Sequence, residues 1–376
     1  MPTDIVITGV GMATSLGFDA ATSCAAARAG VTRPETLDYW VEDAGALESV
    51  PVVGRTMGWY TEGFAEVGRL VQLGRAAARD VVRSAGLDPE ALARTPWLVN
   101  LADGAVEVEA LRVDAEALPA SARESVRPPY AALKPWIDAR LMPGVLSVLP
   151  EAARRAPARV LYHGPAGAAV ALAEARRMLT EGRVRAVIVG GIDALVDLRW
   201  LDAYQTLGLL KSDVVPAGTT PGEAAAFLCV ETAREATARG AAVLGVLGEP
   251  AAGRDTVSRF AEAPPLGAVL ASVMQAALGP ALGPVRRPTC HTGLGGDARR
   301  AGEWGRALVR LQPEIDFAEV DYVAAAFGET GAASGFVSAG VALHAFARGT
   351  AASDTALVWD ASDDGLRGAF LLTHSG

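Results

Sequence analysis

Short apolar runs alternate with amphipathic segments along much of the chain, a pattern typical of strands that alternate with helices. The runs DIVITGV, RVRAVIVGG and AAAFLCVE predict strands, and the second is continuous in its hydrophobicity, as central strands buried on both faces are. Further strands are predicted at AAVLGVLGEP, VDYVAAAF and GAFLLTH, and helices from about Asp19 to Ala27 and at TAREATARG. This alternation indicates α/β layers rather than an all-β sandwich.

One stretch, from Val160 to Ala194, predicts a strand, a tight turn, a long Ala-rich helix and a second strand that ends in two glycines. A chain that turns sharply into a helix between buried strands usually displays a reactive group at the turn. Here the turn carries Gly164 and Pro165. Proline is favoured at the first position of a helix, where its missing N–H costs little, so a structural role is the simpler interpretation.

Two other stretches differ from this pattern. The segment from Thr330 to Phe346 carries no Asp, Glu, Lys or Arg but is short for a membrane span, so a helix buried in the protein core is predicted. The region from about 34 to 158 is less regular and holds four of the seven tryptophans. It is interpreted as an insertion around the core, with no chemistry assigned to it.

Composition narrows the class of protein. The 376 residues, 51% of them hydrophobic, suffice for one large domain or two closely packed ones. A net charge of −9 argues against a nucleic-acid partner. Three scattered cysteines predict a reduced, cytoplasmic protein without disulfides, and the four histidines form no metal-spaced set. The N-terminal run predicts a strand rather than a signal peptide, and no dinucleotide fingerprint follows it, so neither a membrane anchor nor a cofactor is expected.

Four segments, in the right order, resemble the β-ketoacyl synthases of the thiolase-fold condensing enzymes. They are IVITGVGMATSLG, the block from Val160 to Ala194, TPGEAAAFLCVETAREATARGA and FGETGAASGFVSAGVAL. The resemblance implies a thiolase-like α/β fold, with two duplicated βαβαβ halves in α-β-α-β-α layers. The expected halves are residues 1–235, which include the irregular insertion, and residues 236–376.

The catalytic residues that the resemblance implies are absent. In the family a cysteine opens the helix at the turn, and its own N–H forms half of the oxyanion hole. That position corresponds to Pro165, or to Gly164 if the alignment slips by one residue, and neither can be acylated. The family's turn histidine corresponds to Glu329, and its lysine four residues earlier corresponds to Ala325. The chain is therefore predicted to be a pseudoenzyme.

A vestigial pocket is expected where the active site would lie. The family's Gly-rich C-terminal loop is replaced by ASDDGLRG, in which Asp363 and Asp364 would repel an oxyanion rather than stabilise it. His291 stands in a frayed counterpart of the family's other histidine motif, two residues too close to the following aspartate. His163 lies on the turn itself, where a satisfied core histidine is favoured over a ligand-binding one.

Two hypotheses on function follow. In the first, the chain is a subunit resembling a chain-length factor, which pairs with an active ketosynthase in polyketide or fatty-acid-type biosynthesis. In the second, it is a non-catalytic scaffold or adaptor that handles another protein, for example in secretion; an active acyltransferase is the least favoured alternative. Acyl carrier protein or a protein cargo is a further expected partner. The apolar strand Val160, Leu161 and Tyr162 is a poor solvent-exposed edge, so a homodimer or heterodimer through it is expected.

Overall fold

The computed structural model describes residues 4–43, 48–117, 128–213, 215–279, 287–312 and 315–375. Its first half contains five strands in the spatial order β5-β4-β6-β7-β1. β7 runs antiparallel to both of its neighbours, whereas β4 pairs in parallel with β5 and β6. The bounds are β1 (Ile5–Thr14), β4 (Trp97–Leu101), β5 (Ala158–Tyr162), β6 (Ala186–Ala194) and β7 (Glu223–Thr232).

The second half repeats this arrangement with the strand order β11-β10-β12-β13-β8, and β9 extends the last position by also pairing with β13. Counted along the chain, both halves place the third strand first, then the second, fourth, fifth and first. β8 also pairs with β1 and so joins the two sheets. The bounds are β8 (Gly245–Leu247), β9 (Ala251–Arg254), β10 (Thr289–Thr292), β11 (Glu319–Tyr322), β12 (Thr355–Ala361) and β13 (Leu366–Thr373).

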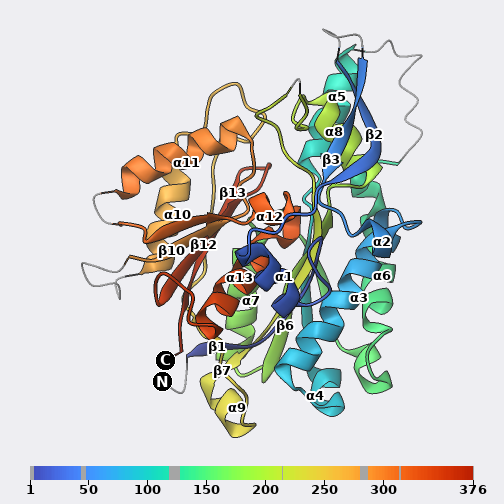
Figure 1. The fold of residues 1–376 in the computed structure, drawn as a ribbon. Helices are drawn as coiled ribbons and strands as arrows, with labels where there is room; N and C mark the ends of the chain where they lie inside the picture. The colour runs from blue at the N-terminus through green and yellow to red at the C-terminus, as the bar shows by residue number, and fades with distance from the viewer. Residues whose placement is uncertain are drawn as a thin grey trace.

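Helices form three layers around the two sheets (Figure 1). α3 and α6 cover the outer face of the first half, and α10 and α11 cover that of the second. Between the sheets α7 packs against α13, and α1 lies beside α13. The bounds are α1 (Ala20–Arg28), α3 (Glu66–Ala85), α6 (Tyr130–Leu146), α7 (Gly167–Thr180), α10 (Ala268–Leu278), α11 (Ala298–Leu311) and α13 (Ser334–Ala347). The five layers confirm the predicted thiolase-like fold.

The remaining elements connect these layers. The hairpin of β2 (Glu35–Asp43) and β3 (Glu48–Gly54) projects from the first half beside α8, in the upper right of Figure 1. The short elements are α2 (Gly58–Thr61), α4 (Pro89–Arg94), α5 (Ala105–Ala117), α8 (Leu198–Thr206), α9 (Ala233–Ala238) and α12 (Ala324–Phe327), with the 3₁₀ turns Glu151–Arg155 and Gly331–Ala333.

Two details of the sequence interpretation differ from the structure. The stretch 34–158 is not an insertion throughout, because it contains α3 and the fully buried strand β4, both part of the first half. Within VDYVAAAF the strand ends at Tyr322 and the alanines form α12, since alanine is the strongest helix former. β7 ends at Thr232 and β8 begins at Gly245, so the division at residue 235 stays a prediction.

The N-terminal glycines serve close packing. A Cβ added to Gly11 would lie 2.2 Å from the backbone N of Val81 in α3, and one added to Gly9 would lie 2.7 Å from Cβ of Ala85. α3 therefore rests directly on the backbone of β1. α13 is buried along most of its length, as predicted from its uncharged sequence. Within the described residues, no helix has the length and apolar character needed to cross a bilayer.

Candidate functional site

The turn between β5 and α7, here called the elbow (His163–Gly167), lies at the centre of the molecule. Gly164 adopts a left-handed conformation with φ +62°, and a Cβ there would lie 2.6 Å from Oδ2 of Asp103. Pro165 is buried, and Ala166 caps the N-terminus of α7. The backbone has the shape of a nucleophile elbow, but the side chain at its tip is a pyrrolidine ring.

Every backbone N–H of the elbow has an acceptor within the protein, and Pro165 has no N–H to offer. Asn100, fully buried in β4, accepts from His163 and donates to the carbonyl of Gly164 at 2.7 Å. The hydroxyl of Ser362 accepts from Ala166 at 2.9 Å and donates to the carbonyl of His163 at 2.6 Å. The N–H groups of Gly164 and Gly167 bond to the carbonyls of Leu101 and Gly164, at 3.0 Å each. No backbone N–H in the elbow is left to stabilise an oxyanion.

The opposite side of the site holds a network of five buried charged side chains, here called the ion cluster (Arg259, Asp297, Arg300, Glu329 and Asp363). Oδ1 of Asp363 lies 2.7 Å from Arg300 and 3.1 Å from Arg259. Arg300 also pairs with Glu329, and Arg259 with Asp297. The residue that replaces the family's histidine thus serves as a counter-ion.

The electrostatics of the ion cluster follow from this pairing. Burial alone would raise the pKa of Asp363, but Arg300 and Arg259 hold it below its usual range. Asp103, across the site, has its pKa raised to about 7 by burial and by the charge of Asp363. Its Oδ1 accepts from the N–H of Ala105, whereas its Oδ2 has no hydrogen-bond partner among the described residues.

The cavity between the elbow and the ion cluster is small. Its volume is about 30 Å³, and its lining includes Asp103, Gly164, Pro165, Tyr204 and Asp363. This space holds a few water molecules at most and cannot admit an acyl chain. In the described chain, the position of the family's active site is therefore filled by protein.

The structure brings together only part of the predicted pocket. Gly164, Pro165 and Asp363 line the elbow cavity. Asp364 lies at its margin, where it pairs with Arg254 at 2.8 Å. His163 is half-buried, and burial lowers its pKa.

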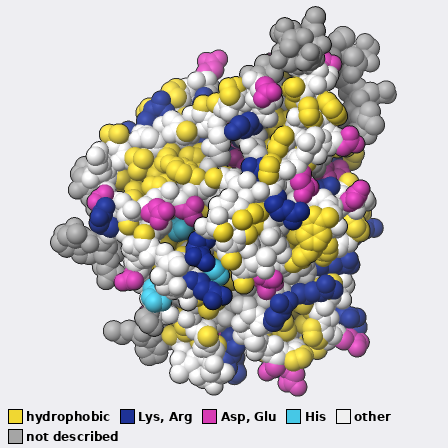
Figure 2. All heavy atoms as spheres, in the orientation of Figure 1, with side chains coloured by type: hydrophobic (Ala, Val, Ile, Leu, Met, Phe, Trp, Pro, Cys, Tyr) yellow, Lys and Arg dark blue, Asp and Glu magenta, His cyan; other side chains and the backbone are white. Residues whose placement is uncertain are grey.

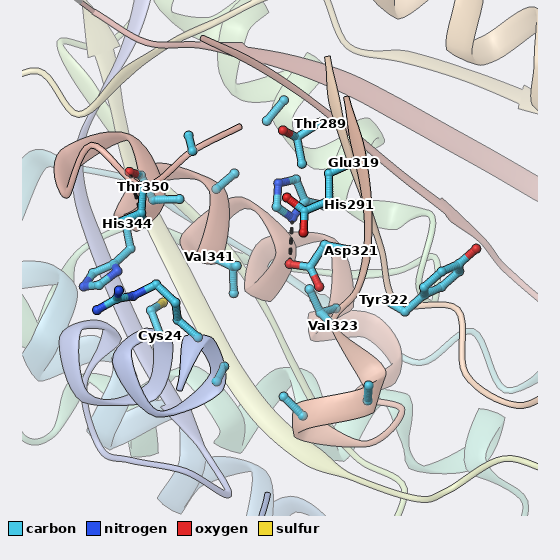
Figure 3. Close-up of a pocket in the computed structure, with 18 of the residues that line it drawn as sticks. Cys24, Thr289, His291, Glu319, Asp321, Tyr322, Val323, Val341, His344 and Thr350 are labelled. Carbon is cyan, nitrogen blue, oxygen red and sulfur yellow. Dashed lines mark hydrogen bonds and ion pairs between the residues drawn. The ribbon is translucent and has the colours of Figure 1, made fainter. Parts of the chain in front are cut away.

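His291 and Ala325 lie elsewhere, and both line a separate, larger pocket (Figure 3). His291, which stands two residues too close to the following aspartate for the family's motif, thus also lies outside the elbow cavity. Ala325 is exposed on α12, away from the elbow cavity. Neither residue can assist chemistry at the elbow from these positions.

No cysteine offers an alternative nucleophile. Cys24, Cys229 and Cys290 are all buried, and burial raises the pKa of each thiol to about 12. A thiol with so high a pKa is not a thiolate near neutral pH. Within the described residues, no group of three His, Cys, Asp or Glu side chains is placed to hold a metal ion.

Sequence reasoning did not single out five residues of the site: Asn100, Asp103, Arg259, Arg300 and Ser362. Asn100 is the single polar residue in the strand WLVNL, and this interruption of an apolar run was a usable signal. Ser362 directly precedes the predicted aspartates. Arg259 and Arg300 gave no signal, because a charged residue shows no sign of burial in the sequence and each has an acceptor, Asp363, far away along the chain.

The chain belongs to the β-ketoacyl synthase family. Residues 3–236 match the family model described as the N-terminal domain of β-ketoacyl synthases. A search of curated proteins finds no match.

Solved structures share the fold over nearly the whole chain. One is the ishigamide ketosynthase/chain length factor, with a TM-score of 0.75, 18% identity and 99% coverage of both chains. Another is the complex of a type II polyketide synthase acyl-carrier protein with its ketosynthase bound to the hexaketide, with a TM-score of 0.77, 16% identity and full coverage of both chains. A β-ketoacyl synthase from Burkholderia phymatum STM815 has a TM-score of 0.71 at 16% identity, covering 99% of this chain and 100% of that one.

Proposed function

We propose that the chain is a non-catalytic subunit of ketosynthase type, similar in role to a chain-length factor, that pairs with an active ketosynthase. The elbow is the observation that carries this proposal. Its backbone turns as a nucleophile elbow does, yet the residue at its tip is Pro165. Every remaining backbone N–H of the elbow is hydrogen-bonded to an acceptor within the protein. A protein that needs the fold but not the chemistry would tolerate both features.

The structural relatives support the pairing. One of them is a ketosynthase/chain length factor, and another is a ketosynthase in complex with its acyl-carrier protein. By analogy, the partners proposed for this chain are a ketosynthase and, through it, an acyl carrier protein. The small volume of the elbow cavity is the observation that favours the second hypothesis, a non-catalytic scaffold or adaptor that handles another protein, because such a protein needs no space for an acyl chain.

Strand β5 is the proposed interface. It ends the sheet order and pairs only with β4, so one side of its backbone has no strand partner among the described residues. Leu161 packs in the core of its own chain, and Val160 and Tyr162 are partly buried. The interface would therefore be made by the backbone of β5 rather than by Leu161, as in a sheet continued across two subunits.

Absence of acylation is the first test. The purified chain, incubated with acyl carrier protein thioesters or acyl-coenzyme A, is expected to keep its unmodified mass in intact-mass spectrometry. The variant Pro165→Cys is expected to remain inactive in condensation, since Glu329 and Asp363 stay in place and the N–H of Ala166 stays bonded to Ser362. A stoichiometric acyl adduct on the wild-type chain would overturn the proposal.

The interface is tested at a single position. In the parallel ladder the N–H of Trp97 bonds to the carbonyl of Pro157, so Val160 has its N–H on the side away from β4. Val160→Pro removes this outward donor and is tolerated only where no strand adds to the edge. We expect Val160→Pro to be a folded monomer in light scattering, whereas Val160→Ala still associates with itself or co-purifies with a ketosynthase. A wild-type chain that stays monomeric and captures no ketosynthase would contradict the pairing.

A further inference from the structure

A second pocket lies between α1, α13, β10 and β11 and is here called the lateral pocket (Figure 3). Its volume is about 400 Å³, more than ten times that of the elbow cavity, and within the range of small-molecule sites. The two cavities share no lining residue. The proposed pairing role assigns nothing to this space.

One side of the lateral pocket is basic. Arg28, in the last turn of α1, is exposed and has no ion-pair partner among the described residues. It lies close to His344 of α13, whose pKa is lowered by burial and by the charges of Arg348 and Arg28. Nε2 of His344 is buried without a hydrogen-bond partner in the described chain. The exposed guanidinium of Arg28, free of an ion pair among the described residues, suits a carboxylate.

The other side is acidic. Nδ1 of His291 lies 3.2 Å from Oδ2 of Asp321, and Glu319 precedes Asp321 by two residues on the edge strand β11. Glu319 is exposed and has no ion-pair partner in the parts of the chain that the structure describes. Thr289 adds a buried hydroxyl, again with no partner among the described residues. Two carboxylates with spare acceptor capacity suit an ammonium group.

An apolar wall separates these two sides. Figure 3 places Val341 between His344 and the group formed by His291, Glu319 and Asp321. Val323 and several alanines complete this wall. In the view of Figure 2, acidic and basic side chains gather beside one another over this part of the molecule, with histidine in cyan among them. Arg28 and Glu319, which have opposite charges and no ion-pair partner among the described residues, therefore line the same hollow on either side of this apolar wall.

We propose that the lateral pocket binds a small linear molecule with a carboxylate at one end, an ammonium group at the other and an aliphatic segment between them. The carboxylate binds at Arg28, the ammonium group at Glu319 and Asp321, and the aliphatic segment lies on Val341. A fatty acid would leave the acidic side without a partner, and a nucleotide would bring phosphate toward two carboxylates. An ω-amino acid satisfies both sides.

Calorimetric titration of the full chain tests this proposal, with 6-aminohexanoate as the probe. Hexanoate and hexylamine, which each keep one charged end, are expected to bind at least tenfold more weakly. The affinities of 4-aminobutanoate and 8-aminooctanoate report the distance between the basic and the acidic side of the pocket. Both are expected to differ in affinity from the six-carbon probe. Absence of binding by 6-aminohexanoate at millimolar concentration, or equal affinity for all three six-carbon ligands, would overturn the assignment.

Variants locate the ligand within the pocket. Arg28→Gln is expected to weaken 6-aminohexanoate at least tenfold without affecting hexylamine, and Asp321→Asn to weaken both amines without affecting hexanoate. Ala352→Trp, in an exposed residue of the lining, is expected to block all three ligands. The control Arg94→Gln, an exposed arginine of α4, is expected to bind as the wild type does. Wild-type affinity in Arg28→Gln and Asp321→Asn would place binding elsewhere and refute the proposal.

Discussion

The two halves of the molecule share one strand order but close the space between them by different means. On the side of the first half, Asn100, together with the hydroxyl of Ser362 from the second half, holds the elbow through neutral hydrogen bonds. On the side of the second half, the ion cluster fills the space with charged groups. In the described chain, the elbow thus has all its backbone N–H groups bonded internally, and the facing side is occupied by paired charged side chains.

This difference predicts unequal responses to mutation. A neutral hydrogen bond contributes about 1 kcal/mol net, so the elbow depends mainly on its backbone shape. A buried charge left without its counter-ion costs several kcal/mol, because the protein interior cannot solvate it. The ion cluster should therefore be the more fragile of the two regions.

Loss of one guanidinium is expected to have the largest effect. Arg300→Met removes the partner of Glu329 and one of the two arginines beside Asp363, leaving buried carboxylates uncompensated. By analogy with other broken buried pairs, we expect the free energy of unfolding to fall by about 3–5 kcal/mol. Urea denaturation followed by circular dichroism measures this change.

The matched control is Arg94→Met. Arg94 is exposed on α4 and forms no ion pair in the described chain, so this variant should change stability by no more than about 0.5 kcal/mol. If both variants cost the same, the ion cluster contributes no more than any surface arginine, and the proposed contrast between the halves fails.

The sequence predicts the architecture well because the fold depends on contiguous patterns. The runs that became β1, β6 and β7 are predominantly apolar, and burial on both faces favours that composition. β4 is also fully buried but only five residues long, and its surroundings are rich in polar helical sequence. For this reason the sequence pattern does not separate β4 from the region 34–158, which is interpreted as an insertion.

The site was less predictable because its contacts are distant along the chain. The substitution at Pro165 is visible in the sequence, and it points to the loss of nucleophile and donor. The pairing of Arg300 with Glu329 is not visible, since a charged residue shows no sign in the sequence of being buried. Asp363 is an example. From the sequence its carboxylate is expected to repel an oxyanion, whereas in the structure its charge is compensated by Arg259 and Arg300.

The backbone shape of the elbow is tested by a pair of glycines. Gly164 and Gly86 both have φ +62°, but a Cβ on Gly86 meets nothing within 4 Å, whereas one on Gly164 meets Asp103. Gly86→Ala should therefore cost about 1 kcal/mol from backbone strain alone. Gly164→Ala should cost about 2–3 kcal/mol, because steric overlap adds to that strain. Equal costs in thermal unfolding would mean that Asp103 moves aside freely and that the elbow is not tightly packed.

The last expected effect depends on pH and lies at Asp103, across the site from the ion cluster. Its pKa is raised to about 7 in the folded protein by burial and by Asp363, whereas an unfolded aspartate titrates near 4. Between these values the folded state binds more protons than the unfolded state, so this group's contribution to stability falls as pH rises from about 4 to about 7. Asp103→Asn mimics the protonated form and keeps the acceptor for the N–H of Ala105.

We therefore expect the melting temperature of Asp103→Asn to match that of the wild type near pH 4 and to exceed it increasingly up to pH 8. The control Asp38→Asn, at an exposed carboxylate of β2, should show no such pH-dependent gain. The charge of Asp363 contributes to the raised pKa of Asp103. Such a pH-dependent gain would therefore show that the ion cluster influences the stability of the elbow through Asp103. A gain that is the same at every pH would show that Asp103 ionises freely in the folded protein, and that the elbow is electrostatically independent of the ion cluster.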